Sequence, residues 1–484
     1  MNIRLDAASQ RPLYLQLRDA MRGQLLSGTL PSGMRLPSSR ELAKSLNVSR
    51  NTVDAAFLLL REDGLIDIRR GLGAFASVSP TKQQESAPLI DWDAAIAPNM
   101  RAFANFREGQ GRVELGSRKV ISFATLAPDY NFFDVDEFRS CLSSVLSREG
   151  PVLLAYGYTR GYEPLREYIA QYLSAKGLLL SGQDILMVSG FRQAAQLIVE
   201  ALVREGESIL VEAPTYNGFL GIVSAKGANA VPVHCDDEGM IESELEKAIL
   251  QHSPKLLYLI PTYHNPTGRN MTLQRRSAIL RIARAHNLPI LEDGFNEELR
   301  FMGEYHPALK ALSGSGDVIH AGSFSKILFP GIRLGWIVGP AKLMRYLTHA
   351  KYNQDIHSPP LLQAALKEYL IRGHLERYLR KIRPLYRMRM DALYQGLDRH
   401  FAGRCTYIKA EGGFSAYLTF PESFNARQNM EKALKNGVLY APGDAFYPGE
   451  GGQNSVRLGF SRLTPPMIDE GLQILSRVFN EAGV

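Results

Sequence analysis

Cysteine is scarce in this sequence, with only Cys141, Cys235 and Cys405 among 484 residues. The three stand far apart, without a CxxC pair or the ligand spacing typical of a zinc site, so the sequence argues against a disulfide framework and predicts no metal site. Such cysteine usage suits a reducing compartment. We interpret all three as small buried apolar side chains.

Long apolar runs are absent as well. No segment approaches the roughly 18 consecutive apolar residues that a membrane span requires. Residues 1–6 lack the apolar core of a signal peptide. These absences predict a soluble, cytoplasmic protein that has no membrane partner.

The length and the charge of the chain point to more than one domain. A chain of 484 residues exceeds what one hydrophobic core usually organises, and a hydrophobic fraction of 45% is ample for packed interiors. The net charge of +7 is uneven, because residues 1–79 carry 11 Lys+Arg against 7 Asp+Glu. More than half of the excess thus lies in a short segment, as expected for a protein that binds phosphate backbones, although a solvated charged face gives the same count.

Residues 11–78 read as three short helices followed by two strands. Apolar residues at helical spacing begin at Leu13, and a second and a third helix are expected to start from caps at Ser38 and Ser49. Two short helices across a tight turn form a helix-turn-helix, in which the second helix places its N-terminal residues in the major groove. The alternating residues 65–68, followed by Arg69-Arg70-Gly71-Leu72-Gly73, predict a two-stranded wing with arginines at its tip.

The motifs of this module resemble the GntR family of winged-helix DNA-binding domains. They are LPSSRELA from residue 36, VSRNTV from residue 48 and GLG from residue 71, in that family's order and spacing. The resemblance implies that the module binds double-stranded DNA, and Asp54 stands where some relatives carry a further arginine. The candidate DNA contacts are Ser38, Arg40, Ser49, Arg50, Asn51, Thr52, Arg70 and Gly71.

Residues 79–116 are predicted to be a linker, because they are poor in periodicity and rich in Ser, Gln, Pro and Ala. Within them, Trp92, Ile96, Met100 and Phe103 supply apolar surface. We expect this part of the linker to dock on the domain that follows.

Residues 117–484 alternate short apolar runs with helical patterns, which predicts an α/β domain with a mostly parallel sheet whose ligand lies at the carboxyl ends of the strands. One such strand leads into Gly190, Phe191 and Arg192 and then a helix, so the first backbone N–H groups of that helix can bind a phosphate. Each polar residue at a strand end, taken alone, has an ordinary structural explanation such as a cap, a turn or a solvated lysine. The residues at the other strand ends are Tyr216, Asn265, Asp293, Ser323, Ser325 and Lys326.

Together these residue types supply what pyridoxal 5'-phosphate (PLP) requires. A lysine amine forms a Schiff base with the cofactor, an aspartate keeps the pyridine nitrogen protonated, and a hydrogen-bond donor steadies the phenolate oxygen. The hydroxyls of Ser323 and Ser325, with the guanidinium of Arg333, can complete a phosphate cup through charge-assisted hydrogen bonds.

From about Tyr156 to the end, the order of these residues resembles the class I aminotransferases of PLP fold type I. The resemblance implies a smaller C-terminal α/β subdomain, the Schiff base at Lys326, and a tyrosine at position 156 that reaches the phosphate in the partner subunit. It also implies that Arg457 grips a carboxylate, which suits the bidentate fork of an arginine. The implied cofactor contacts are Asp293, Asn265, Tyr216, Gly190, Phe191, Arg192, Ser323, Ser325, Arg333 and Tyr156.

Two positions depart from the aminotransferase pattern. Phe295 stands where many relatives carry a tyrosine near the cofactor, which leaves Asn265 as the main donor to the ring oxygen. Ala127 and Pro128 stand where relatives often have a glycine-rich substrate loop.

The joined modules resemble the MocR group of bacterial regulators, also called the GabR type. The resemblance implies a head-to-tail homodimer on paired promoter half-sites, whose grip on DNA changes when an amino compound, or PLP itself, binds. Two alternatives stay open: a working aminotransferase with a DNA-binding appendage, and a GntR-type repressor whose large domain is a dimerisation scaffold without a cofactor.

Overall fold

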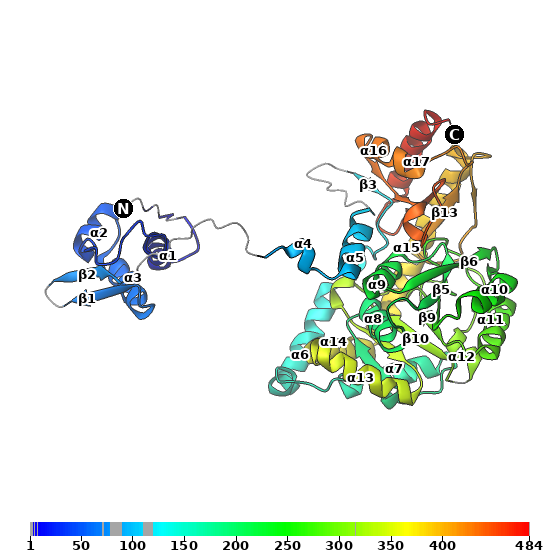
Figure 1. Ribbon diagram of the computed structural model, residues 1–484, viewed down its shortest axis with the longest axis horizontal. Helices are drawn as coiled ribbons and strands as arrows, with labels where there is room; N and C mark the ends of the chain where they lie inside the picture. Colours follow the sequence, from blue (N-terminus) through cyan, green and yellow to red (C-terminus); the bar gives the residue numbers. More distant parts are fainter. Residues whose placement is uncertain are drawn as a thin grey trace. The chain divides into compact units, whose positions relative to one another are not determined.

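The computed structural model describes residues 3, 5–6, 8–69, 72–77, 90–109, 120–314 and 316–483. The chain divides into two compact units, Met1–Ala95 and Ile96–Val484 (Figure 1). The predicted fold class is confirmed, since a small helical module with a two-stranded wing precedes an α/β domain. In the described ranges, none of the helices has the length and apolar character needed to span a bilayer.

The first unit packs its helices around one apolar core. Leu17, Met21 and Leu25 recur on one face of the first helix and are fully buried, together with Leu60 of the third. The two strands pair antiparallel from Ile66↔Ala76 to Arg69↔Gly73. The elements are α1 (Leu13–Leu26), α2 (Ser39–Leu46), α3 (Arg50–Glu62), β1 (Ile66–Arg69), β2 (Gly73–Ala76) and α4 (Trp92–Ala95).

The second unit is built on an eight-stranded sheet in the order β4-β11-β10-β9-β8-β5-β6-β7. Strands β10, β9, β8, β5 and β6 run parallel to one another. Strand β11 is antiparallel to both β10 and β4, and β7 is antiparallel to β6. The strands are β4 (Ile185–Val188), β5 (Ser208–Ala213), β6 (Asn229–Asp236), β7 (Gly239–Met240), β8 (Leu256–Leu259), β9 (Ile290–Asp293), β10 (Val318–Ser323) and β11 (Gly335–Val338).

Helices cover both faces of this sheet, because alternate residues of each strand point to opposite sides. On β4, Leu186 and Val188 pack with α8, α9 and α13, whereas Ile185 and Met187 pack with α7, α14 and α15. The helices are α6 (Val135–Leu153), α7 (Glu163–Ser174), α8 (Phe191–Leu202), α9 (Asn217–Lys226), α10 (Glu242–His252), α11 (Leu273–Ala285), α12 (Leu309–Ser313), α13 (Ala341–Asp355), α14 (Pro360–Ile371), α15 (His374–His400), α16 (Ala426–Lys435) and α17 (Pro465–Asn480).

A smaller antiparallel sheet, in the order β12-β13-β16-β15, follows with its own apolar core against α15, α16 and α17. Strand β3, near the start of the large unit, also belongs to this C-terminal part, because it pairs in parallel with β14. The remaining strands are β3 (Ile121–Ser122), β12 (Thr406–Tyr407), β13 (Ser415–Thr419), β14 (Val438–Leu439), β15 (Ala441–Pro442) and β16 (Ser455–Gly459). Short 3-10 turns are η1 (Tyr130–Phe132), η2 (Gly182–Asp184), η3 (Pro330–Ile332) and η4 (Gly443–Phe446).

The stretch predicted to be an irregular linker contains a helix, α5 (Pro98–Gly109). Proline at the first helical position is favourable, and the Asn99 side chain donates to the carbonyl of Ala225 on α9 at 2.7 Å. Met100 of this helix keeps 48% of its surface exposed, so contact within its own unit covers α5 only in part. Residues 79–89 and 110–116 of the predicted linker lie outside the described residues.

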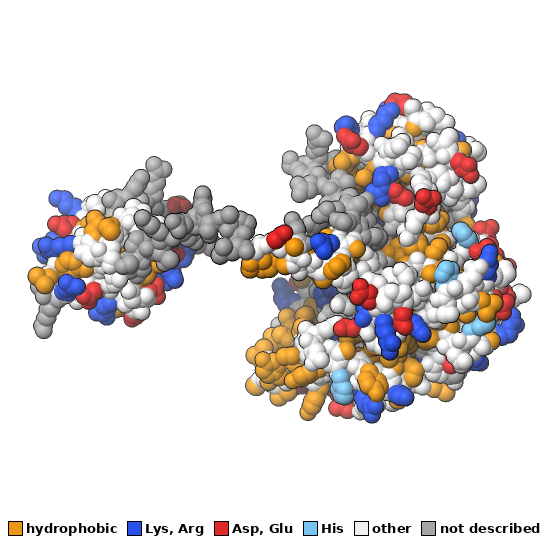
Figure 2. Space-filling model, in the orientation of Figure 1, with side chains coloured by type: hydrophobic (Ala, Val, Ile, Leu, Met, Phe, Trp, Pro, Cys, Tyr) orange, Lys and Arg blue, Asp and Glu red, His pale blue; other side chains and the backbone are white. Residues whose placement is uncertain are grey.

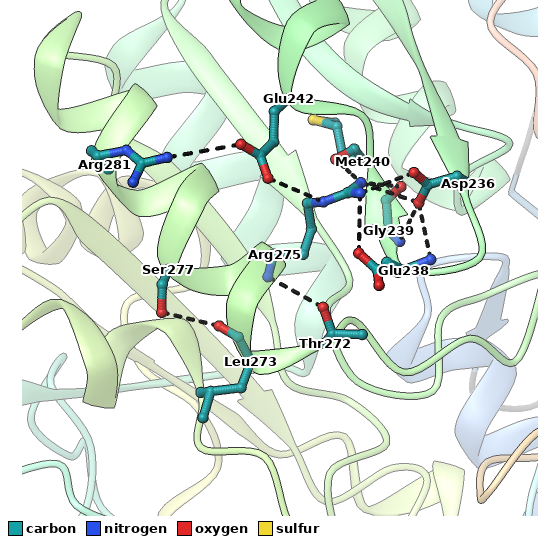
Figure 3. A network of polar contacts seen from close by, with 10 residues as sticks. All are labelled: Asp236, Glu238, Gly239, Met240, Glu242, Thr272, Leu273, Arg275, Ser277 and Arg281. Atoms are coloured by element: carbon teal, nitrogen blue, oxygen red, sulfur yellow. Dashed lines mark hydrogen bonds and ion pairs between the residues drawn. The ribbon is translucent and has the colours of Figure 1, made fainter.

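The outer edge of the large sheet is held by Arg275 of α11, whose guanidinium is the centre of a polar network (Figure 3). It pairs with Asp236 at 2.9 Å and donates to the carbonyl of Met240 at 2.7 Å, and it also pairs with Glu238 and Glu242. The planar fork of an arginine suits several acceptors at once. This network ties the hairpin of β6 and β7 to α11.

Candidate functional site

A cavity of about 320 Å³ opens at the carboxyl ends of strands β8, β9 and β10, where the parallel arrangement places the strand-end residues side by side. Its wall combines residues from seven separate parts of the sequence. The predicted residues that line it are Phe191, Arg192, Tyr216, Asn265, Asp293, Ser323, Ser325, Lys326, Arg333 and Arg457.

Asp293, the last residue of β9, is the buried acid of the cavity, with 2% of its surface exposed. The hydroxyl of Tyr258 donates to its Oδ2 at 3.0 Å, and the backbone N–H of Phe295 donates to its Oδ1 at 3.2 Å. Burial raises the pKa of Asp293 to about 8, while these two hydrogen bonds oppose the rise because they favour the charged form. The two donors fix both oxygens of this acid, and in its ionised form it can accept from a protonated ring nitrogen.

Lys326 follows β10 and lines the same cavity as Asp293. Its amine donates to the carbonyl of Leu126. Burial, and then the positive charge of Arg457, lower the pKa of Lys326 to about 8. A lysine that loses its proton this easily is a nucleophile toward a carbonyl group at near-neutral pH.

The N-terminus of α8 forms one end of the cavity. Gly190 precedes the helix with a φ of 84°, and a Cβ atom at this position would lie 3.2 Å from the guanidinium of Arg333. Arg333 donates to the carbonyl of Ser189, and the hydroxyl of Ser325 is buried without a hydrogen-bond partner among the described residues. Helix N–H groups, a guanidinium and an unpaired hydroxyl are the donors that a phosphate monoester requires, so this end fits the phosphate of PLP.

Arg457 of β16 also lines the cavity, with 8% of its surface exposed. Its guanidinium donates to Asn265 Oδ1 at 3.1 Å and to the carbonyl of Ala124 at 2.7 Å, and its Nε is buried without a partner in the described structure. Burial lowers the pKa of Arg457 to about 10, so the group stays charged at neutral pH. A charged guanidinium with a spare donor suits a carboxylate ligand.

Tyr156 does not line this cavity. It is 85% exposed, in an apolar segment with Val152, Leu154 and Tyr158, which are 75%, 72% and 84% exposed. Figure 2 shows hydrophobic side chains gathered over the part of the molecule that holds α6. An exposed apolar cluster of this kind is typical of a protein interface.

The two departures from the aminotransferase pattern have a place at the site. Phe295 lines the cavity, so an apolar ring occupies that part of its wall. Two hydrogen bonds hold the segment with Ala127 and Pro128. The hydroxyl of Ser461 donates to the carbonyl of Ala127 at 2.7 Å, and Arg462 donates to the carbonyl of Pro128 at 3.0 Å.

Sequence reasoning missed four residues of the site. Leu126, Asn217 and Pro330 also line the cavity, and Tyr258 contacts Asp293 from the neighbouring strand. Asn217 and Pro330 lie beside predicted residues, so adjacency was an available signal. Leu126 and Tyr258 carry no local signal, because their positions depend on long-range packing.

In the first unit, the predicted DNA-reading residues lie at two helix starts. Ser38 caps α2 in a capping box with Glu41, and Ser49 caps α3, where its hydroxyl lies 2.8 Å from that of Thr52. The side chains of Arg40, Arg50 and Asn51 are exposed. Arg50 pairs with Asp54 at 3.5 Å, and the predicted wing contacts Arg70 and Gly71 lie outside the described residues.

Comparisons with known proteins agree with this division of the chain. Residues 13–75 match the gntR family of bacterial regulatory proteins, and residues 120–475 match the class I and II aminotransferases. The uncharacterized HTH-type transcriptional regulator YisV of Bacillus subtilis is 32% identical over 96% of this chain and 95% of its own length. The probable rhizopine catabolism regulatory protein MocR of Rhizobium meliloti is 28% identical over 98% of this chain and 95% of its own length.

Among solved structures, the α-aminoadipate aminotransferase LysN of Thermus thermophilus superposes with a TM-score of 0.75. It is 29% identical and covers 81% of this chain and 99% of its own, and its crystals contain N-(5'-phosphopyridoxyl)-L-leucine. That compound joins a phosphopyridoxyl group to an amino acid.

Proposed function

Because this chain belongs to the class I and II aminotransferase family and carries a gntR-family DNA-binding domain ahead of it, we propose that it is a transcription regulator that binds PLP and senses an amino compound. One observation carries the proposal: Lys326, Asp293 and Arg457 line a single cavity in a chain that also holds a DNA-binding module. On this proposal residues 11–78 bind DNA, residues 79–116 link the domains, and residues 117–484 form the effector domain.

The residues of the cavity would hold the cofactor along its whole length. PLP supplies an electrophilic carbonyl carbon and an electron-withdrawing ring. Asp293 would accept a hydrogen bond from the ring nitrogen and Asn265 would face the ring oxygen, while Tyr216 would pack on the ring. The helix start at Gly190, with Arg333, Ser323 and Ser325, would bind the phosphate.

The amine of Lys326 would bind the cofactor carbonyl and yield that position to the amine of an effector. Arg457 would then orient the effector by its carboxylate, so the favoured ligands are amino acids or other amino compounds that carry an anionic group. Ligand binding controls DNA only if the two conformations of the protein differ in their affinity for the ligand.

A head-to-tail homodimer completes the proposal. The exposed cluster of Val152, Leu154, Tyr156 and Tyr158 would be covered by a second copy, and Tyr156 would reach the phosphate in the partner's cavity. Two DNA-binding modules in one dimer would read two promoter half-sites, since the spacing of half-sites follows the symmetry of the protein.

The test combines absorbance with DNA binding on the same samples. The protein is loaded with PLP and titrated with a panel of amino acids and amines, while fluorescence anisotropy follows a DNA fragment that the protein has selected from random sequences. We expect one compound to shift the visible band of lysine-bound PLP and to change the affinity for DNA at the same concentration. A protein that binds no PLP, or whose DNA affinity ignores every ligand, would overturn the proposal.

A working aminotransferase is the second candidate, favoured by the presence of the lysine, the aspartate and the carboxylate-binding arginine in one cavity. Its sign in the same titration is the replacement of the lysine-bound band by the pyridoxamine form, with release of a 2-oxo acid. Repeated turnover with an added 2-oxo acid would establish an enzyme, whereas a persistent shifted band would favour the sensor.

A further inference from the structure

We infer that Tyr258 is a positioning residue that holds the carboxylate of Asp293 in place for the pyridine nitrogen of the cofactor. The inference rests on the proposed binding of PLP, and it adds a residue that the family pattern in the sequence did not indicate. Tyr258 lies on β8 and Asp293 on the neighbouring strand β9.

The register of the two strands brings these side chains to one face of the sheet. Tyr258 stands opposite Leu291, so Asp293 lies two residues further along and points to the same side. The phenol hydroxyl donates to Asp293 Oδ2 at 3.0 Å. The contact is therefore a consequence of strand pairing between two buried strands.

The phenol ring itself is held rigidly. It is fully buried and stacks on Phe219 of α9, with 3.7 Å between ring centroids and 17° between ring planes. A second ring, Phe191 at the start of α8, lies 6.0 Å away. A donor whose oxygen is fixed in this way favours one orientation of the carboxylate, because the oxygen cannot move to follow a rotated acceptor.

Packing alone does not require the hydroxyl of Tyr258, because a phenylalanine would fill the same space. The other residues of β8 are leucines, and the neighbouring rings are phenylalanines. A buried hydroxyl costs free energy unless it is hydrogen-bonded, so a tyrosine at this place is explained by its acceptor, Asp293.

The remaining charged groups near Asp293 do not replace this contact. His320 of β10 and Glu297 pair with each other at 3.0 Å. His320 stands opposite Glu292 in the sheet, so its side chain points to the face away from Asp293. On the face that Asp293 shares with the cavity, the phenol of Tyr258 is the side chain that donates to it among the described residues. Burial and the charge of Asp293 raise the pKa of this phenol well above its usual value, so it stays protonated.

The experiment is a double-mutant cycle of Tyr258→Phe and Asp293→Asn, read as the dissociation constant of PLP. We expect Tyr258→Phe to bind PLP roughly tenfold more weakly or worse, because the variant loses a hydrogen bond to a charged group. If the phenol acts through the carboxylate, the same substitution changes the affinity little in the Asp293→Asn background. The pH titration of the visible band gives a second readout, which should shift in Tyr258→Phe.

Tyr394→Phe is the matched control, because its buried hydroxyl accepts from the backbone N–H of Ala410 at 2.7 Å in the C-terminal subdomain. It should lower the melting temperature and leave PLP affinity unchanged. Unchanged PLP affinity in Tyr258→Phe would overturn the inference alone, as would an equal loss in both backgrounds. Failure of the wild-type protein to bind PLP would overturn the proposed function and the inference together.

Discussion

Arg457 and Asn265 are joined by a hydrogen bond of 3.1 Å from the guanidinium to the side-chain oxygen. The arginine belongs to β16 of the small sheet, and the asparagine follows β8 of the large sheet. The proposed carboxylate site and the proposed donor to the cofactor ring are thus adjacent, and a ligand that engages one also meets the other.

Replacing Arg457 tests the class of effector. Arg457→Gln should weaken the binding of carboxylate-bearing effectors by about 2–5 kcal/mol, which is at least roughly thirtyfold, because a buried charged partner is lost. Amines without a carboxylate should bind with unchanged affinity. The measurement is the midpoint of the spectral titration for matched amino acid and amine pairs. An equal loss for both members of a pair would remove Arg457 from carboxylate recognition.

Replacing Lys326 separates the cofactor from the DNA. Lys326→Ala removes the lysine amine that lines the cavity, so the visible band of lysine-bound PLP should disappear. DNA binding in anisotropy should largely remain, since the DNA-binding unit has its own core. Equal loss of both properties would show that the lysine is structural.

The loading of PLP should depend on pH in a defined direction. The amine reacts when it is neutral, and its pKa is lowered to about 8, so the initial rate should rise with pH and level off beyond about 8. Part of this lowering comes from the charge of Arg457. Arg457→Gln should therefore move the rise to higher pH in stopped-flow absorbance. A rise at the same pH in both proteins would contradict this assignment.

Arg50 tests the DNA interface. It is exposed at the first position of α3, and Arg50→Ala should weaken specific DNA binding by about 1–3 kcal/mol if it contacts a base. Arg61, at the other end of the same helix, is a matched control that removes the same charge. Arg61→Ala should change the affinity little in a gel shift, and the absorbance of bound PLP should be the same in both variants. Equal effects of the two substitutions would show a general loss of charge.

A buried ion pair between Asp129 and Arg389 leads to a prediction about the free energy of unfolding. Asp129 and Arg389 lie 2.8 Å apart and are 4% and 6% exposed. Asp129→Ala should lower the free energy of unfolding by about 3–5 kcal/mol, because it leaves a buried guanidinium without its partner. Arg399→Ala breaks the exposed pair with Asp469 and should cost about 1 kcal/mol or less. Denaturant unfolding of the large domain measures both, and similar losses would contradict the role of burial.

The strand-end residues could be predicted from the sequence because their placement follows a local rule. Asp293 and Lys326 come directly after apolar runs, and the carboxyl ends of parallel strands meet at one edge of the sheet. Tyr258 could not be predicted, since its contact depends on the register between β8 and β9. Leu126 precedes Lys326 by 200 residues, and only the folded chain brings them together.

The linker shows the opposite kind of error. Trp92, Ile96, Met100 and Phe103 recur every three or four residues, which is helical spacing. This local signal for α5 was present, but the Ser, Gln, Pro and Ala content of the stretch led to the prediction of an irregular linker. Contact with α9 stabilises this helix further. The partial exposure of Met100 could not be predicted from its apolar character alone.

On the proposed function, the caps of α2 and α3 limit how operator preference can be re-engineered. The hydroxyls of Ser38 and Ser49 accept hydrogen bonds from backbone N–H groups of α2 and α3. Replacing such a cap by alanine costs about 1 kcal/mol of stability. Arg50 and Asn51 do not cap either helix. A library that aims to retarget the protein to new promoters should therefore vary Arg50 and Asn51 and keep both serines, so that altered specificity is not confused with a frayed helix.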